Sequence, residues 1–164
     1  AQILGGTCSM RAIEAYLGRI EQYAPISDAV FRVLFSLIFI VGGLGHFFRT
    51  REMLTRIDQS PWVDVVRRVG DPTLLLWLSG IVLVLAGVCL AVGIMTRASA
   101  LLLLVTLIPI TLSIHVAPGH VGPLLKNVAI LGGLIHFLVR GPGAYALQPE
   151  ARLESRQRTI RTWR

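Results

Sequence analysis

Four apolar runs, separated by short polar segments, dominate this chain. A helix needs roughly 20 mostly apolar residues to cross the hydrocarbon core of a bilayer, and each run is about that long. The runs therefore predict an all-α integral membrane protein. Their closely spaced small residues favour a compact four-helix bundle. The predicted spans are residues 29–48, 73–95, 98–117 and 122–139.

The composition agrees with a membrane protein and excludes other classes. Of the 164 residues, 54% are hydrophobic and 15% are charged, whereas an ordinary soluble domain carries about a quarter charged residues. This balance argues against a soluble enzyme and against disorder. The net charge of +7 would suit a nucleic-acid-binding protein. However, the basic residues lie between and after the apolar runs, as in membrane proteins, so we expect no nucleic-acid partner.

Arginine is distributed unevenly between the two sides of the predicted bundle. Four spans place both termini on the same side. That side carries nine arginines, namely Arg11, Arg19, Arg97, Arg140, Arg152, Arg156, Arg158, Arg161 and Arg164. The other side carries five, namely Arg49, Arg51, Arg56, Arg67 and Arg68. Because cytoplasmic loops carry an excess of basic residues, both termini are predicted to be cytoplasmic.

The segments outside the spans also have predicted roles. In segment 1–28, apolar residues recur at helical spacing between positions 10 and 24, which indicates an amphipathic helix on the membrane surface or against a partner. Loop 49–72 should form short interfacial helices broken at Pro61. Segment 29–148 would then form the membrane domain, and 149–164 a basic tail. Pro109 should kink the third span.

Several polar side chains are expected within or at the ends of the spans. An ionisable residue in a span costs at least ~2.5 kcal/mol on insertion scales, so it normally faces the bundle and marks a site. The candidates for a binding site are Arg32, His46, His115, Lys126 and Asn127. Arg32 begins the first span near the cytoplasmic side. The other four are predicted to lie at similar depth near the outer face.

These residue types suit a quinone headgroup. A neutral imidazole can exchange a hydrogen bond or a proton with a quinone oxygen, and a lysine in low dielectric favours an anion. A simpler interpretation stays open, in which Lys126 extends to the interface and the histidines cap helix ends. We expect no metal site, because no HxxxH, ExxH or CxxCH pattern occurs. The absence of a cofactor fingerprint makes an accessory subunit a better hypothesis than an independent oxidoreductase.

Four stretches resemble the DoxX family of small four-span membrane proteins. After Arg32 come GGLGHF at 42–47 and GIMTRASALLLL at 93–104, which is similar to the family's turn between spans two and three. His115 follows, and KNVAILGGLIHFLVRGPGAYAL at 126–147 is similar to the family's ending. The resemblance covers about residues 30–148. Two positions depart from the pattern, because His46 stands where the family often has lysine and Leu83 where many members have an acid.

The resemblance implies a function only in outline. The family takes its name from a subunit linked to thiosulfate:quinone oxidoreduction and terminal oxidase preparations, and other members resemble accessory partners in oxidative-stress membrane complexes. Our first hypothesis is therefore an accessory subunit of a quinone-linked redox system in the bacterial inner membrane, with quinone as its ligand. Its partners would be the lipid bilayer and either other redox subunits or further copies of itself. The alternatives are a scaffold without a ligand and, third, a small transporter.

Overall fold

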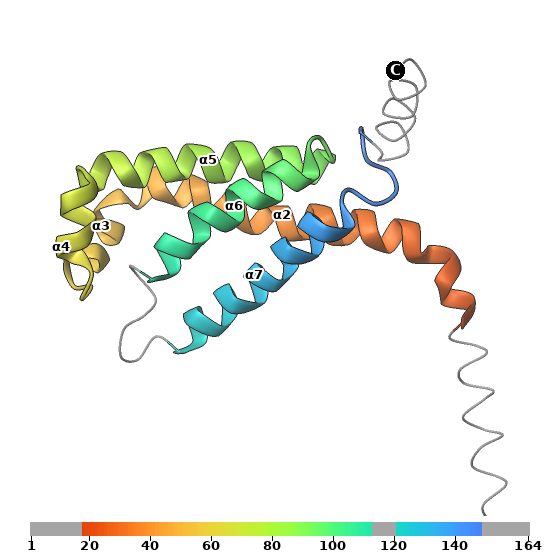
Figure 1. The fold of residues 1–164 in the computed structure, drawn as a ribbon, viewed down its shortest axis with the longest axis horizontal. Coiled ribbons are helices and arrows are strands. Elements are labelled where there is room, and N and C mark those ends of the chain that lie inside the picture. The colour runs from red at the N-terminus through yellow and green to blue at the C-terminus, as the bar shows by residue number, and fades with distance from the viewer. Residues whose placement is uncertain (1–17, 113–120, 149–164) are drawn as a thin grey trace, which may run out of the picture.

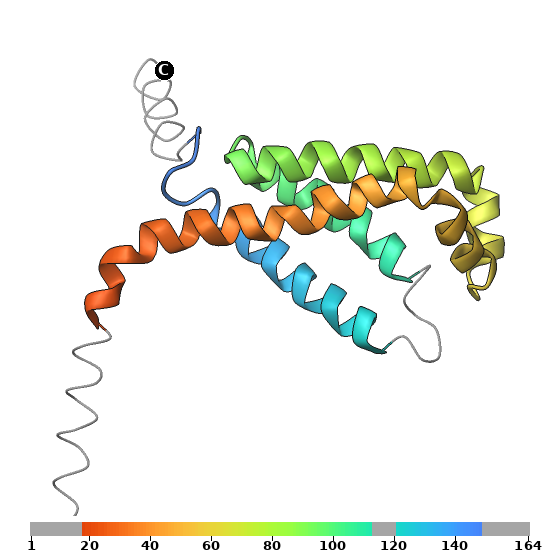
Figure 2. The same cartoon turned by 180° about the vertical axis from the view of Figure 1, so that it is seen from behind.

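The computed structural model describes residues 18–112 and 121–148, and all regular elements in these two ranges are helical (Figure 1). They are η1 (Arg19–Tyr23), α2 (Ala24–Phe48), α3 (Thr50–Asp58), α4 (Val63–Val69), α5 (Pro72–Val92), α6 (Thr96–Ile110) and α7 (Val121–Arg140). The predicted all-α class is confirmed. The helices α2, α5, α6 and α7 form the bundle, and α3 and α4 lie at one end of it, hereafter the α3–α4 end (Figures 1 and 2).

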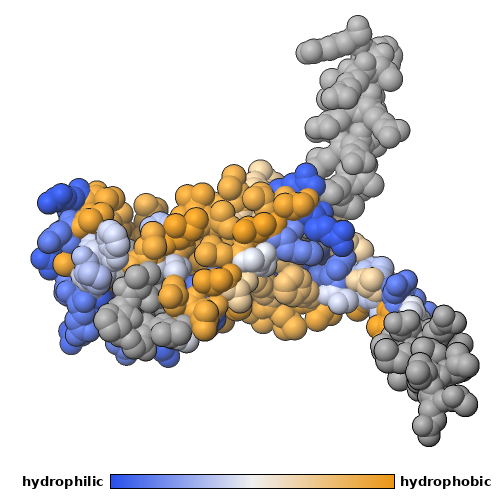
Figure 3. All heavy atoms as spheres, turned by 60° about the horizontal axis from the view of Figure 1, so that its bottom comes forward, coloured by the Kyte–Doolittle hydropathy of each residue, from blue (hydrophilic) through white to orange (hydrophobic). Residues whose placement is uncertain are grey.

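The lengths and hydropathy of these helices suit a bilayer. Helices α2, α5 and α7 are each long and apolar enough to cross a membrane, and α6 is a shorter apolar helix of 15 residues. At 1.5 Å per residue α6 rises about 22 Å, less than the roughly 30 Å of a hydrocarbon core. On the face shown in Figure 3, hydrophobic residues cover the middle of the described part of the molecule, and hydrophilic residues gather towards its ends. The chain is a multi-pass membrane protein.

The first and third bundle helices begin ahead of the predicted spans, which start at residues 29 and 98. Helix α2 begins at Ala24, ahead of residue 29, with Pro25 in its first turn. Proline is well suited to a helix start, and the polar Ser27 and Asp28 lie in the helix although they fall outside the apolar run. Helix α6 ends at Ile110, with Pro109 in its last turn.

The segments outside the spans are described in part. Two short helices, α3 and α4, form in loop 49–72 and are separated around Pro61, as predicted. Of the predicted amphipathic segment, residues 18–28 are described, and η1 leads directly into α2. The remainder of that segment, residues 113–120 and the basic tail lie outside the described residues.

Three glycines allow α2 and α5 to approach closely. A Cβ atom added at Gly43 would lie 2.8 Å from the carbonyl oxygen of Gly80, and one at Gly80 would lie 2.9 Å from the Cβ of His46. A Cβ at Gly87 would lie 3.1 Å from Ile40. Small residues of this kind favour helix association in lipid, because no hydrophobic force drives two apolar helices together there. The packing places His46 directly against α5.

Helices α6 and α7 complete the core. Phe35 of α2 occupies the space beside Gly133 of α7, so that a Cβ added at this glycine would clash with the ring. The same ring packs against Phe137, with 5.5 Å between the ring centroids. The apolar core consists of Phe35, Phe39, Leu83, Ala86, Leu90, Ala100, Leu103, Leu107, Ile130, Leu134 and Phe137. It joins the four bundle helices along one continuous seam.

Candidate functional site

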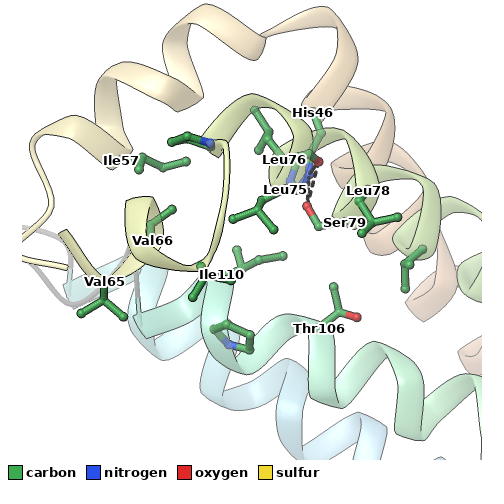
Figure 4. Close-up of a pocket in the computed structure, with 14 residues that line it drawn as sticks. His46, Ile57, Val65, Val66, Leu75, Leu76, Leu78, Ser79, Thr106 and Ile110 are labelled. Atoms are coloured by element: carbon green, nitrogen blue, oxygen red, sulfur yellow. Dashed lines mark hydrogen bonds between the residues drawn. The ribbon is translucent and has the colours of Figure 1, made fainter. Parts of the chain in front are cut away.

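His46 lies in the last turn of α2, buried against α5 with 5% of its surface exposed. Its Nδ1 is 3.1 Å from the carbonyl oxygen of Leu76 and 3.0 Å from Oγ of Ser79 (Figure 4). The Ser79 hydroxyl itself donates to the Leu76 carbonyl at 2.8 Å. Because a carbonyl only accepts, the contact with Leu76 assigns the imidazole proton to Nδ1. Nε2 then carries a lone pair, and it makes no hydrogen bond to any described residue.

An apolar cavity of about 410 Å³ lies on one side of His46. Figure 4 shows side chains converging on it from α4, α5 and α6. Its polar lining side chains are His46, Ser79 and Thr106. The apolar lining consists of Ile57, Val65, Val66, Val69, Pro72, Leu75, Leu76, Leu78, Val82, Pro109 and Ile110. Ligand sites commonly have this volume and this mixture of an apolar wall with a few placed polar groups.

A second cavity, of about 230 Å³, also has His46 in its wall and is hereafter the basic cavity. Its polar lining side chains come from three helices, namely His46 of α2, Arg56 of α3, and Lys126 and Asn127 of α7. The apolar lining consists of Ile38, Phe39, Gly42, Met53, Leu83, Leu107, Ile110 and Ile130. Since His46 and Ile110 line both cavities, the imidazole lies at the boundary between an apolar space and a basic one.

Asn127 is held in one orientation in the basic cavity. It is 4% exposed, and its Nδ2 donates to Oγ1 of Thr111 at 2.9 Å. Thr111 gives its own proton to the carbonyl oxygen of Leu107 at 2.7 Å, so its oxygen must accept from the amide nitrogen. The Asn127 oxygen makes no hydrogen bond to the described residues. Among those residues, the cavity therefore offers acceptors at Nε2 of His46 and Oδ1 of Asn127, and donors at Lys126 and Arg56.

Arg32, also a predicted site residue, lies far from this cluster. It precedes His46 by 14 positions on α2, which is about 21 Å along a helix. Its guanidinium is buried and donates to the carbonyl oxygens of Ala91, Pro142, Ala144 and Tyr145. The side chain thus joins α2 to the end of α5 and to the segment that follows α7.

The structure brings together three of the five predicted site residues. His46, Lys126 and Asn127 line the basic cavity, Arg32 lies towards the opposite end of the bundle, and His115 lies outside the described residues. The sequence did not predict Ser79 or Arg56. Ser79 could have been noticed as one of the few polar residues in the second span. Arg56 gave no signal, because it is one of five arginines outside the spans on its side of the chain.

Together, the apolar helices and the buried polar cluster define a helical multi-pass membrane protein with a candidate ligand site between its helices. A comparison with models of known families identifies the family of this protein. The DoxX family model matches residues 27–116, more than half of the chain, and the chain belongs to that family. The match covers α2 to α6, so Lys126 and Asn127 of α7 lie beyond it. No curated protein and no solved structure matches the chain.

Proposed function

We propose that this protein is an accessory membrane subunit of a quinone-linked redox system and binds a quinone or quinol headgroup beside His46. The observation that carries the proposal is the position of His46 between the two cavities, with Nδ1 engaged by Leu76 and Nε2 unbonded among the described residues. A neutral imidazole in this tautomer accepts a hydrogen bond from a hydroxyl group.

The two cavities suit the two parts of such a ligand. The apolar cavity would take the apolar tail, because its wall is almost entirely aliphatic. The basic cavity would take the headgroup, with the hydroxyl donating to His46 and a second oxygen accepting from Lys126 or from the remaining amide hydrogen of Asn127. A quinone and its quinol differ by protons and electrons that a partner must supply or remove. The chain carries no cofactor fingerprint, which favours a partner subunit as the electron donor.

The proposal includes an orientation in the membrane. We place the α3–α4 end on the outer side of a bacterial inner membrane and both termini in the cytoplasm. The arginine distribution supports this placement. The candidate site would then lie near the outer face, within reach of quinones that diffuse in the bilayer.

A direct binding measurement tests the site. The purified protein in lipid nanodiscs should bind a short-tailed quinol, detected by isothermal titration calorimetry. The variant His46→Phe keeps a ring of similar size but loses the acceptor, and losing one buried hydrogen bond should weaken binding about tenfold. His136→Phe is the matched control, because His136 packs edge-on against Phe137 on another part of α7 and lines neither cavity.

Two results would contradict the proposal. Binding that His46→Phe leaves unchanged would move the ligand away from His46. No quinol binding at all, combined with stable capture of a partner membrane complex, would favour the ligand-free scaffold.

A further inference from the structure

Among the described residues, the lining of the basic cavity includes two positive charges and no Asp or Glu. The charges are those of Arg56 of α3 and Lys126 of α7. The ion pair found among the described residues joins Arg67 to Asp58, at 3.0 Å, so Asp58 is already engaged. Glu52 is the other acid of α3, and it makes no ion pair with Arg56 in the described part of the chain.

The position of Arg56 follows from the packing of α3. Met53 of α3 lies against α2. Its Cε would be 3.7 Å from a Cβ atom added at Gly45. Ile57, next to Arg56 in the chain, is 6% exposed and lines the apolar cavity. Because Ile57 and Met53 fix α3 against the bundle, Arg56 is held at the rim of the basic cavity. Lys126 reaches the same cavity from α7, a helix far away in sequence.

The polar side chains that line the basic cavity are of two kinds. The buried side chains His46 and Asn127 are uncharged hydrogen-bonding groups, whereas Arg56 and Lys126 are exposed cations. Two like charges at one small cavity repel each other, and an anion between them would relieve that repulsion. An uncharged ligand would gain only hydrogen bonds from the same groups.

Resting on the proposed function, we infer that the basic cavity selects an anionic headgroup, meaning a quinone-type ring that carries an ionised hydroxyl. The ionised oxygen lies between Arg56 and Lys126, and the ring meets His46 and Asn127. Arg56 thus becomes a specificity-determining residue, and it acts through charge. A neutral ring of the same shape binds the same cavity more weakly.

A matched pair of probes tests the selection. 2-Hydroxy-1,4-naphthoquinone is ionised at neutral pH because its hydroxyl is a vinylogous acid, and 2-methoxy-1,4-naphthoquinone is its neutral analogue. Binding of each to the protein in nanodiscs of uncharged lipid is measured at pH 7 and corrected for uptake by empty nanodiscs. One exposed ion pair changes an affinity by up to about fivefold, so the two cations should give the anion a preference of roughly tenfold.

Variants identify the residues responsible. Arg56→Gln and Lys126→Gln should each lower the anion preference by about threefold. Added salt should lower the anion preference of the wild-type protein. The matched control is Arg51→Gln, on the same helix as Arg56 but absent from the lining of either cavity. It should leave the preference unchanged.

The outcomes separate this inference from the function on which it rests. If both probes bind equally well, and the short-tailed quinol still binds the wild type more tightly than His46→Phe, the quinone site stands and the anionic selectivity is refuted. If Arg51→Gln lowers the preference as much as Arg56→Gln does, the effect is general surface charge and the selectivity is again refuted. If neither probe binds although the short-tailed quinol does, this inference alone fails. If none of the three ligands binds, the proposed function and this inference both fail.

Discussion

Replacing Arg32 by methionine should lower the free energy of unfolding. The loss should exceed that caused by replacing any other arginine at the end of the bundle opposite the α3–α4 end. Arg32 is 2% exposed, and its guanidinium donates to four backbone carbonyls on two other segments. The bond to Tyr145, at 2.9 Å, and the bond to Pro142 are the closest. Those to Ala91 and Ala144 are longer, at 3.3 and 3.4 Å.

The magnitude follows from those bonds. A hydrogen bond from a charged donor contributes about 1.5–3 kcal/mol, so the two closest bonds together contribute roughly 3–6 kcal/mol. Methionine avoids the cost of burying a charge, which offsets part of that sum. We expect the free energy of unfolding to fall by about 3 kcal/mol. Arg32→Lys should give an intermediate loss, because an ammonium group cannot reach several carbonyls in one plane as a guanidinium does.

Equilibrium unfolding in mixed detergent and SDS micelles, followed by circular dichroism, measures the effect. Arg140→Met is the control, because Arg140 ends α7 near the same segment, is exposed, and makes no hydrogen bond to the described residues. Its loss should stay within about 0.5 kcal/mol, as for most surface changes. Equal effects of Arg32→Met and Arg140→Met would refute the argument that the carbonyl bonds of Arg32 hold α2, α5 and the segment after α7 together.

Two further predictions concern packing and orientation. Gly80→Ala should cost about 1–3 kcal/mol of unfolding free energy, measured in the same assay, because its Cβ would lie 2.9 Å from that of His46. A Cβ added at Gly42 would meet nothing within 4 Å, so Gly42→Ala should instead stabilise α2 by about 0.5–1 kcal/mol. A larger loss of stability for Gly42→Ala than for Gly80→Ala would contradict this packing. For the orientation, a membrane-impermeant maleimide applied to intact cells should label Gln59→Cys at the α3–α4 end and not Leu147→Cys, in a background without the native cysteines. Labelling of Leu147→Cys alone would invert the proposed topology.

The sequence predicted which segments are helices, but not how the helices face one another. Apolar runs identify spans because twenty apolar residues have few other stable environments, and Pro61 separates α3 from α4 because proline lacks the N–H a helix needs. Helices α5 and α6, however, are apolar on all sides. An evenly apolar helix carries no stripe that marks its buried face. Gly80 therefore gave no signal as a contact with α2.

The candidate site shows the same division. His46, Lys126 and Asn127 were predicted from the sequence, because polar groups in an apolar span are costly and conspicuous. The role of Arg32 was not, since its carbonyl partners at Pro142 and Tyr145 are more than a hundred positions away.

By itself, the sequence determined that this chain enters the membrane as helices, and which polar side chains go with them. Only the tertiary structure decided that His46 separates two cavities, that Arg56 of a surface helix lies at one of them, and that Arg32 joins three segments. The physical reason is the range of the interactions. Hydropathy and helix formation act between near neighbours in the chain, whereas a cavity and its charges depend on which distant helices pack together.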